Sequence, residues 1–164
     1  IQTLPPPPCR EGAGGWVWGA NMSNVVNYEL RGSAALITLN RPDKRNALSR
    51  ELIAALTDAF LRAANDPAAR GVILTGGGPA FCAGMDLEEL RGTLGADSDK
   101  VWDDAKRLAS LYDLIYTLPK PTVAAVNGAA VAGGAGLATV CDLAVSVPDA
   151  KFGYPEVRRG LVAA

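Results

Sequence analysis

The stretch NGAAVAGGAGLATVCDLAVSVPDAKFGYPE, residues 127–156, is the part of this sequence that decides the fold. It begins with a turn of glycines and alanines and ends on a carboxylate, Glu156, that follows a proline. Residues this small let backbone N–H groups come close to a bound molecule. Gly133 and Gly134 are expected to begin a short helix, whose first N–H groups have no acceptor within the helix. Backbone donors beside one carboxylate are the groups that chemistry through an oxyanion needs.

Strands and helices are predicted to alternate on either side of this stretch. Apolar runs that predict strands occupy residues 28–31, 34–39, 71–75, 122–126 and 142–147. The run at 71–75 is expected to be buried on both faces. This alternation indicates an α/β architecture with crossover connections.

Helical spacing of apolar residues predicts two longer helices, over about 49–66 and 99–117. Ser49 is expected to cap the first helix, and Asp66-Pro67 is expected to end it. The second helix is expected to bury one face, made up of Val101, Ala105, Leu108, Tyr112 and Ile115.

The composition is typical of a globular protein. Apolar residues make up 49% of the 164 residues, and charged residues make up 20% with a formal net charge of −1. The length fits one domain with a core of its own. The basic residues are scattered, so nothing indicates binding to nucleic acid or to an anionic membrane surface. No apolar run approaches the roughly 20 residues that are needed to cross a bilayer.

The sequence contains no histidine, and this limits its chemistry. A Ser-His-Asp or Cys-His nucleophile system and the usual zinc sites are excluded, and no metal site is expected. Acid–base chemistry must then use carboxylates, Tyr, Lys or Cys. The three cysteines, Cys9, Cys82 and Cys141, form no C-x-x-C pair, which indicates reduced thiols in a cytoplasmic protein. Cys82 and Cys141 are interpreted as small buried residues rather than as nucleophiles.

Residues 1–21 differ in composition from the rest of the chain. Four consecutive prolines at 5–8 favour polyproline II, and several glycines follow them. The segment has no signal-peptide pattern. It is interpreted as a disordered leader or scar that precedes the folded part at 22–164, with an interaction tail as the alternative.

Two strand-to-helix junctions share one design. The segments 74–86 and 126–134 each leave a predicted strand and enter a helix through small residues. Together they could supply two converging N–H donors, those of Met85 and Gly133; equally, both could be ordinary tight turns. A dinucleotide site is not favoured, because Thr139 replaces the third glycine of the G-x-G-x-x-G pattern.

Six short motifs follow one another in a recognisable order. They are ITLNRPDKRNALS at 37–49, FCAGMDL at 81–87, KPTVAAVNG at 120–128, AGG at 132–134, CD at 141–142 and FGYPE at 152–156. From about residue 27 to its end, the chain thereby resembles the crotonase superfamily, the enoyl-CoA hydratase/isomerase family. The resemblance implies a single-domain spiral of ββα units that binds an acyl-CoA thioester and forms homotrimers or dimers of trimers. Coenzyme A is then part of the substrate, and no separate cofactor is implied.

The resemblance also implies roles for individual residues. The N–H groups of Met85 and Gly133 would hold the thioester oxygen while an enolate develops, with Glu156 as the acid–base group. The coenzyme A thioester would be lined by Arg45, Ala47, Ala83, Gly84, Met85, Asp86, Leu87 and Gly133.

One departure from the family bears on the reaction. Hydratases of this family use two glutamates, which align with positions 136 and 156, but position 136 is a glycine here. Members that keep only the second glutamate resemble double-bond isomerases, so one-glutamate chemistry is favoured. Hydration stays open, because a second group could come from Glu88, Glu89, Asp142 or Tyr154.

The second departure is the end of the sequence. Residues 160–164 are the last, where the family continues into further helices, so a truncated chain without that helical part is expected. The alternatives are a fragment that folds or oligomerises without turnover, or another reaction of the family such as thioester hydrolysis. Hydrolysis is less favoured because no nucleophile is evident.

Overall fold

The computed structural model, which describes residues 24–93 and 98–159, contains two sheets, and from residue 71 onward successive strands join them alternately. The larger sheet has the order β1-β2-β3-β5-β7 and the smaller one the order β4-β6-β8. In the larger sheet β1 and β2 form an antiparallel hairpin, while the other neighbouring strands are parallel. The larger sheet consists of β1 (Val26–Arg31), β2 (Ala34–Leu39), β3 (Gly71–Gly76), β5 (Thr122–Val126) and β7 (Leu143–Ser146). The smaller, all-parallel sheet consists of β4 (Ala80–Cys82), β6 (Ala129–Val131) and β8 (Phe152–Gly153).

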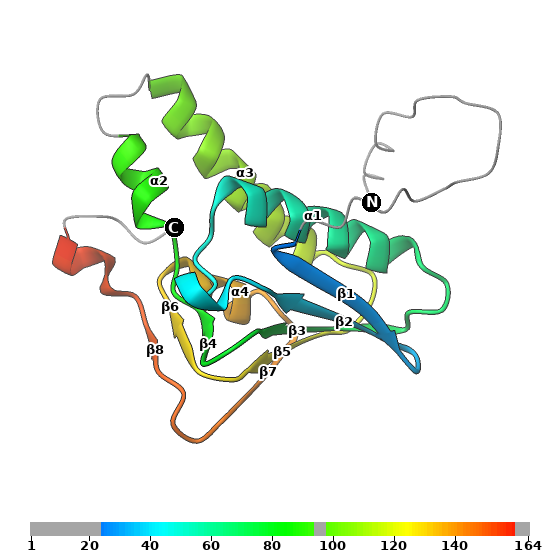
Figure 1. The fold of residues 1–164 in the computed structure, drawn as a ribbon. Coiled ribbons are helices and arrows are strands. Elements are labelled where there is room, and N and C mark those ends of the chain that lie inside the picture. Colours follow the sequence, from blue (N-terminus) through cyan, green and yellow to red (C-terminus); the bar gives the residue numbers. More distant parts are fainter. Residues whose placement is uncertain (1–23, 94–97, 160–164) are drawn as a thin grey trace.

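Helices follow the strand pairs. The α-helices are α1 (Arg50–Asn65), α2 (Leu87–Gly92), α3 (Ser98–Tyr116) and α4 (Gly133–Thr139), and two 3-10 turns are η1 (Pro42–Lys44) and η2 (Pro155–Arg159). The order β3-β4-α2-α3, β5-β6-α4, β7-β8-η2 repeats one strand for each sheet and then a helix. Figure 1 shows α1 and α3 lying over one face of the larger sheet. The predicted spiral of ββα units is confirmed.

The core lies between the larger sheet and α1. On β2 the side chains alternate, so that Ala35, Ile37 and Leu39 are fully buried. Helix α1 buries a face of six residues: Leu52, Ile53, Leu56, Ala59, Phe60 and Ala63. The Ser49 hydroxyl accepts a hydrogen bond from the Leu52 N–H at 3.1 Å, which confirms the predicted N-cap.

Two polar side chains attach β5 to its neighbours. The Lys120 ammonium donates to the carbonyl oxygens of Ala63 at 2.6 Å and Asp66 at 2.7 Å, which satisfies the carboxyl end of α1. The Asp142 carboxylate accepts from both the N–H and the hydroxyl of Thr122, at 2.7 and 2.9 Å. The KPT and CD motifs therefore contain residues that hold the larger sheet together.

Two predictions about burial were wrong in part. Val72 and Leu74 of β3 are buried, but Ile73 and Thr75 on its other face are only half-buried. On α3, Leu108 and Ile115 are buried as expected, whereas Val101 and Ala105 are exposed. The amino-terminal half of α3 extends past the sheet toward α2 (Figure 1), so its apolar face does not meet the core. The predictions about residues 1–21, 160–164 and Cys9 lie outside the described residues.

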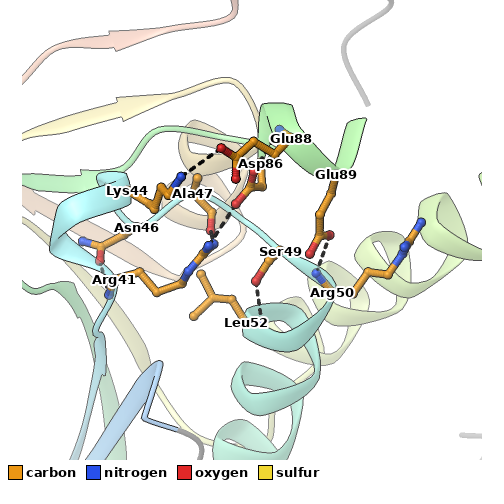
Figure 2. Close-up of polar contacts among 10 residues, drawn as sticks. All are labelled: Arg41, Lys44, Asn46, Ala47, Ser49, Arg50, Leu52, Asp86, Glu88 and Glu89. Atoms are coloured by element: carbon orange, nitrogen blue, oxygen red, sulfur yellow. Dashed lines mark hydrogen bonds and ion pairs between the residues drawn. The ribbon is translucent and has the colours of Figure 1, made fainter. Parts of the chain in front are cut away.

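The loop between β2 and α1 is fixed to the loop between β4 and α2 by a polar network. Figure 2 shows the Arg41 guanidinium between Asp86, at 3.0 Å, and the Ala47 carbonyl, at 2.6 Å. The Asn46 side chain is fully buried; it accepts from the Arg41 N–H and donates to the carbonyls of Gly77 and Ala80. Asp86 also caps α2 by accepting from the Glu88 N–H. The network thus holds together two segments whose residues Arg41 and Asp86 are 45 positions apart in sequence.

The environment of Asp86 lowers the pKa of its carboxyl group. Burial alone would raise this pKa, but the hydrogen bond from Arg41 and the N–H groups at the start of α2 outweigh it. The carboxylate is therefore more stable as an anion in the folded chain than in the unfolded chain. By linkage, it contributes stability above the unfolded pKa of about 3.9, and the contribution is lost as the pH falls through the folded pKa.

Replacing Arg41 by methionine tests this network. Arg41→Met keeps the aliphatic stem but leaves the buried Asp86 carboxylate without its cation. We expect the free energy of unfolding, measured by urea denaturation at pH 7, to fall by about 3 kcal/mol. Lys44→Met, which removes only the exposed pair with Glu88, should cost less than about 1 kcal/mol. The cost of Arg41→Met should shrink below about pH 4; equal costs for both variants, or a cost independent of pH, would contradict the assignment.

Candidate active site

A cleft of about 340 Å³ lies where the smaller sheet, α3 and the start of α4 meet. It brings together residues that are far apart in sequence: Ala83 and Met85, Tyr112, Gly133 and Gly136, and Glu156. A second, mostly apolar cleft of about 310 Å³ between α1, α2 and α3 shares the lining residues Met85, Leu90, Leu108 and Tyr112 with the first. Three residues with predicted catalytic roles, Met85, Gly133 and Glu156, therefore line one cleft.

The backbone direction of Met85 follows from its pairing with Leu48. The Leu48 N–H donates to the Gly84 carbonyl at 2.8 Å, and the Asp86 N–H donates to the Leu48 carbonyl at 3.0 Å. In a parallel bridge of this kind, the residue between the two bonded groups points its own N–H and C=O away from the partner strand. The Met85 N–H therefore points away from Leu48.

Gly84 and Gly133 lie against one another at the amino-terminal end of α4. Gly84 has a φ of +87°, and a Cβ there would lie 2.9 Å from the Val131 carbonyl oxygen and 3.4 Å from the Gly133 nitrogen. Only glycine, which has no Cβ, can occupy position 84 at these distances. The two segments that sequence reasoning paired through Met85 and Gly133 are thus in backbone contact.

Ala132 precedes the first residue of α4 in an unusual conformation. Its φ is +53° and its ψ is −128°, a region that an L-residue with a side chain rarely adopts. The Ala132 N–H donates a hydrogen bond to the Gly153 carbonyl oxygen of β8 at 2.8 Å. This strained residue turns the chain from β6 into α4 and so sets the direction of the Gly133 N–H. Strain of this kind collects at functional sites.

Glu156 lies on η2 at the cleft, half-buried. Its Oε2 atom is buried and has no hydrogen-bond partner among the described residues. A buried carboxylate oxygen without a donor is costly, and such an oxygen beside a cleft is available to a bound molecule.

Tyr112 of α3 is a cleft residue that sequence reasoning placed only on a buried helix face. Its hydroxyl donates to the Gly133 carbonyl at 2.7 Å. Burial, and then the charges of Cys82, Tyr154 and Glu156, raise the pKa of this hydroxyl well above its ordinary value, so it stays a donor at neutral pH. The sequence did contain a signal for this contact: a tyrosine on a predicted buried helix face needs a hydrogen-bond partner for its hydroxyl.

Six of the eight residues expected to line the coenzyme A thioester fall into two groups, whereas Gly84 and Asp86 do not line the cleft. Ala83, Met85, Leu87 and Gly133 line the cleft itself. Arg45 and Ala47 belong to the adjoining loop, which is bonded to Ala83 through the Arg45 carbonyl at 3.0 Å, and the Arg45 side chain is exposed. The Asp86 side chain is turned toward Arg41 and the start of α2.

Three of the four candidates for a second acid–base group are engaged elsewhere. Glu88 pairs with Lys44, Glu89 accepts from the Arg50 N–H, and Asp142 binds Thr122. The fourth, Tyr154, lines the cleft and lies 3.1 Å from the Thr139 hydroxyl oxygen. The only carboxylate that lines this cleft, within residues 24–93 and 98–159, is Glu156.

The two cysteines within the described part of the chain are free and buried. Burial raises the pKa of Cys82 to about 12 and that of Cys141 to about 11, so both thiols are protonated at neutral pH. The burial agrees with their interpretation as small buried residues. Among the residues that the structure describes, no cluster of three metal-ligating side chains occurs, and no helix has the length and apolar character needed to cross a membrane.

Comparison with known proteins gives consistent matches. Residues 29–164 match the sequence profile of the family described as enoyl-CoA hydratase/isomerase. A Thermus thermophilus protein assigned as an enoyl-CoA hydratase is 47% identical over 134 residues, which are 82% of this chain and 53% of that protein. The hydroxycinnamoyl-CoA hydratase-lyase of Pseudomonas fluorescens is 38% identical over 139 residues, 84% of this chain and 50% of the relative.

Comparison with solved structures gives a match of the same kind. The crystal structure of a Legionella pneumophila protein assigned as an enoyl-CoA hydratase/isomerase (crotonase) superposes with a TM-score of 0.83 at 35% identity. The match covers 85% of this chain and 54% of that one. The chain thus spans about half the length of the curated relatives that it matches.

Proposed function

Because the chain belongs to the enoyl-CoA hydratase/isomerase family, we propose that it acts on an acyl-CoA thioester through an enolate, with one carboxylate as the acid–base group. The observation that carries this proposal is the buried Glu156 oxygen, which lies at the cleft without a hydrogen-bond partner among the described residues. Matched relatives named for coenzyme A thioesters support the substrate class.

The proposed reaction needs three groups. The N–H groups of Met85 and Gly133 bind the thioester oxygen, and this makes the adjacent carbon acidic enough for a carboxylate base. Glu156 removes a proton from that carbon and leaves the negative charge on the bound oxygen. It then returns the proton two carbons along the acyl chain, so the double bond moves and no atom is gained or lost.

Double-bond isomerisation is favoured over hydration. Hydration needs a second group to hold the water, but Gly136 has no side chain, and Glu88, Glu89 and Asp142 have other partners. The fourth candidate, Tyr154, lines the cleft without being a carboxylate, and its hydroxyl lies 3.1 Å from that of Thr139. Coenzyme A enters as part of the substrate, so no separate cofactor is invoked. A homotrimer or a dimer of trimers, and a reducing cytoplasmic location supported by two buried free thiols, belong to the same proposal.

A second candidate function is that this chain folds and associates without turnover. It is favoured by exposed apolar side chains on an edge strand of each sheet and on η2: Leu143 and Val145 on β7, Phe152 on β8 and Val157 on η2, all more than half exposed. Exposed apolar surface of this extent is typical of an interface.

Glu156→Gln keeps the shape of the side chain but cannot accept a proton. In a form of the protein that has the length of its relatives, we expect turnover of a 3-enoyl-CoA to fall by about 10²–10⁴-fold. Acyl-CoA affinity, measured by calorimetry, should change by only a few-fold. The unaltered protein should isomerise a 3-enoyl thioester faster than it hydrates a 2-enoyl thioester. Full activity of Glu156→Gln would disprove the role of Glu156 as the acid–base group. Efficient hydration with poor isomerisation by the unaltered protein would disprove isomerisation as its reaction.

Gly133→Pro tests the proposed backbone donor, and Gly133→Ala is its matched control. Both variants add a Cβ, which would lie 3.1 Å from the Leu48 Cδ1 and Tyr112 hydroxyl atoms, but only proline removes the N–H. Position 133 is the first of α4, where proline breaks no helix hydrogen bond, but proline disfavours the conformation of Ala132 before it, so native circular dichroism is required of both variants. We expect kcat to fall by about 10²–10³-fold for proline relative to alanine. Equal kcat values in two variants with native circular dichroism would exclude this donor.

The choice between the two candidate functions can be made by comparing the 164-residue chain with a form that has the length of its relatives. If the exposed edge of β7 and β8 is an interface, the chain should self-associate in size-exclusion chromatography and turn over acyl-CoA negligibly, while the form with the length of its relatives is active. A monomer with a cooperative melt and the turnover of the longer form would rule out the second candidate.

A further inference from the structure

Tyr112 occupies the space next to Gly136. A Cβ at position 136 would lie 2.7 Å from the Tyr112 hydroxyl oxygen, 2.9 Å from Cζ and 3.2 Å from Cε2. Contacts below 3.0 Å do not occur between real atoms of this kind, so any side chain at position 136 requires the tyrosine ring to move. Tyr112 and Gly136 are therefore a matched pair: the ring fills the volume that the glycine leaves empty.

The same side chain also holds the first residue of α4. Its hydroxyl donates to the Gly133 carbonyl at 2.7 Å. Gly133 has no side chain of its own to restrict its backbone, so a bond to its carbonyl limits rotation about that residue. Leu108, Leu111 and Ile115 of the same helix are buried in the core and anchor α3 there. The ring is thus a rigid support between α3 and α4.

We propose that Tyr112 is a positioning and specificity-determining residue of this site. It fixes the Gly133 backbone at the thioester oxygen, and it occupies the place of a second carboxylate at position 136. This inference rests on the proposed function, because the Gly133 N–H is the donor that Tyr112 positions. A site built this way keeps one carboxylate, Glu156, and leaves no room for a glutamate that would hold a water for hydration.

The first test asks whether Tyr112 acts through Gly133. Tyr112→Phe keeps the ring but removes the bond to the Gly133 carbonyl. In the Gly133→Ala background, in a form with the length of its relatives, kcat should fall by about 2- to 10-fold, the worth of one hydrogen bond, with KM within about two-fold. In the Gly133→Pro background the same change should have no effect, because the donor is already absent. Tyr116→Phe, at an exposed position of the same helix, is the control. It should change neither kcat nor KM in either background.

The outcomes separate this inference from the proposed function. If Gly133→Pro itself leaves kcat unchanged, the proposed oxyanion donor is wrong. If Gly133→Pro is costly but Tyr112→Phe lowers kcat equally in both backgrounds, or in neither, the proposed function stands and the positioning role of Tyr112 is overturned.

The second test concerns the volume above Gly136. Gly136→Glu alone should gain almost no hydration of a 2-enoyl-CoA and should lower the melting temperature, because Tyr112 blocks the new side chain. Tyr112→Ala combined with Gly136→Glu opens that volume. The rate of hydration should then rise by about 10²-fold over Gly136→Glu alone, which is the low end of the rate contribution of a general acid–base group. Equal hydration by the single and double variants would overturn the specificity role. If neither of these variants folds, the Tyr112→Phe comparison above decides the proposal.

Discussion

The ion pair between Arg41 and Asp86 is the contact on which the candidate site depends. It joins two loops that follow different strands, and the buried Asn46 side chain adds bonds to Gly77 and Ala80 in the same region. With the loops held together, Leu48 bonds on both sides of Met85, and the Met85 N–H is turned away from Leu48. A partly buried ion pair contributes little net free energy in general, because the cost of removing its charges from water offsets their attraction. In this structure the pair joins the two loops whose pairing directs the Met85 N–H away from Leu48.

Close backbone approach is the second constraint on the site. Gly84 meets the residues that enter α4, and a Cβ at Gly134 would overlap the carbonyl group of Cys82 on β4. Small residues therefore let α4 lie against the smaller sheet, and the strained Ala132 turns the chain into it. The geometry suits chemistry in which backbone donors stabilise charge, because rigid donors need no reorganisation when the charge develops. Tyr112 supplies from α3 the contact that Gly133 cannot make with a side chain of its own.

Much of the fold was predictable because its signals are local. The hairpin at β1 and β2, the Ser49 cap and the start of α4 at Gly133 all agree with expectations from nearby residues. The site residues Met85, Gly133 and Glu156 were assigned by resemblance, and the structure brings them to one cleft, although their roles are still predictions. The burial of α3 was predicted wrongly at Val101 and Ala105, because helical periodicity marks an apolar face but not whether a partner is present.

By itself, the sequence limited the groups available for acid–base chemistry and determined the order of elements. The absence of histidine, the glycine at position 136 and the small residues around Gly133 limit the acid–base groups whatever the fold. Only the tertiary structure decided which polar residues are free to act. Glu88, Glu89 and Asp142 are equivalent to Glu156 as carboxylates, yet each has a partner supplied by a distant segment. The contacts of Tyr112 with Gly133 and Gly136 likewise join α3 to α4 across more than 20 residues. Such contacts depend on how helices and strands pack, and no local pattern of residues encodes them.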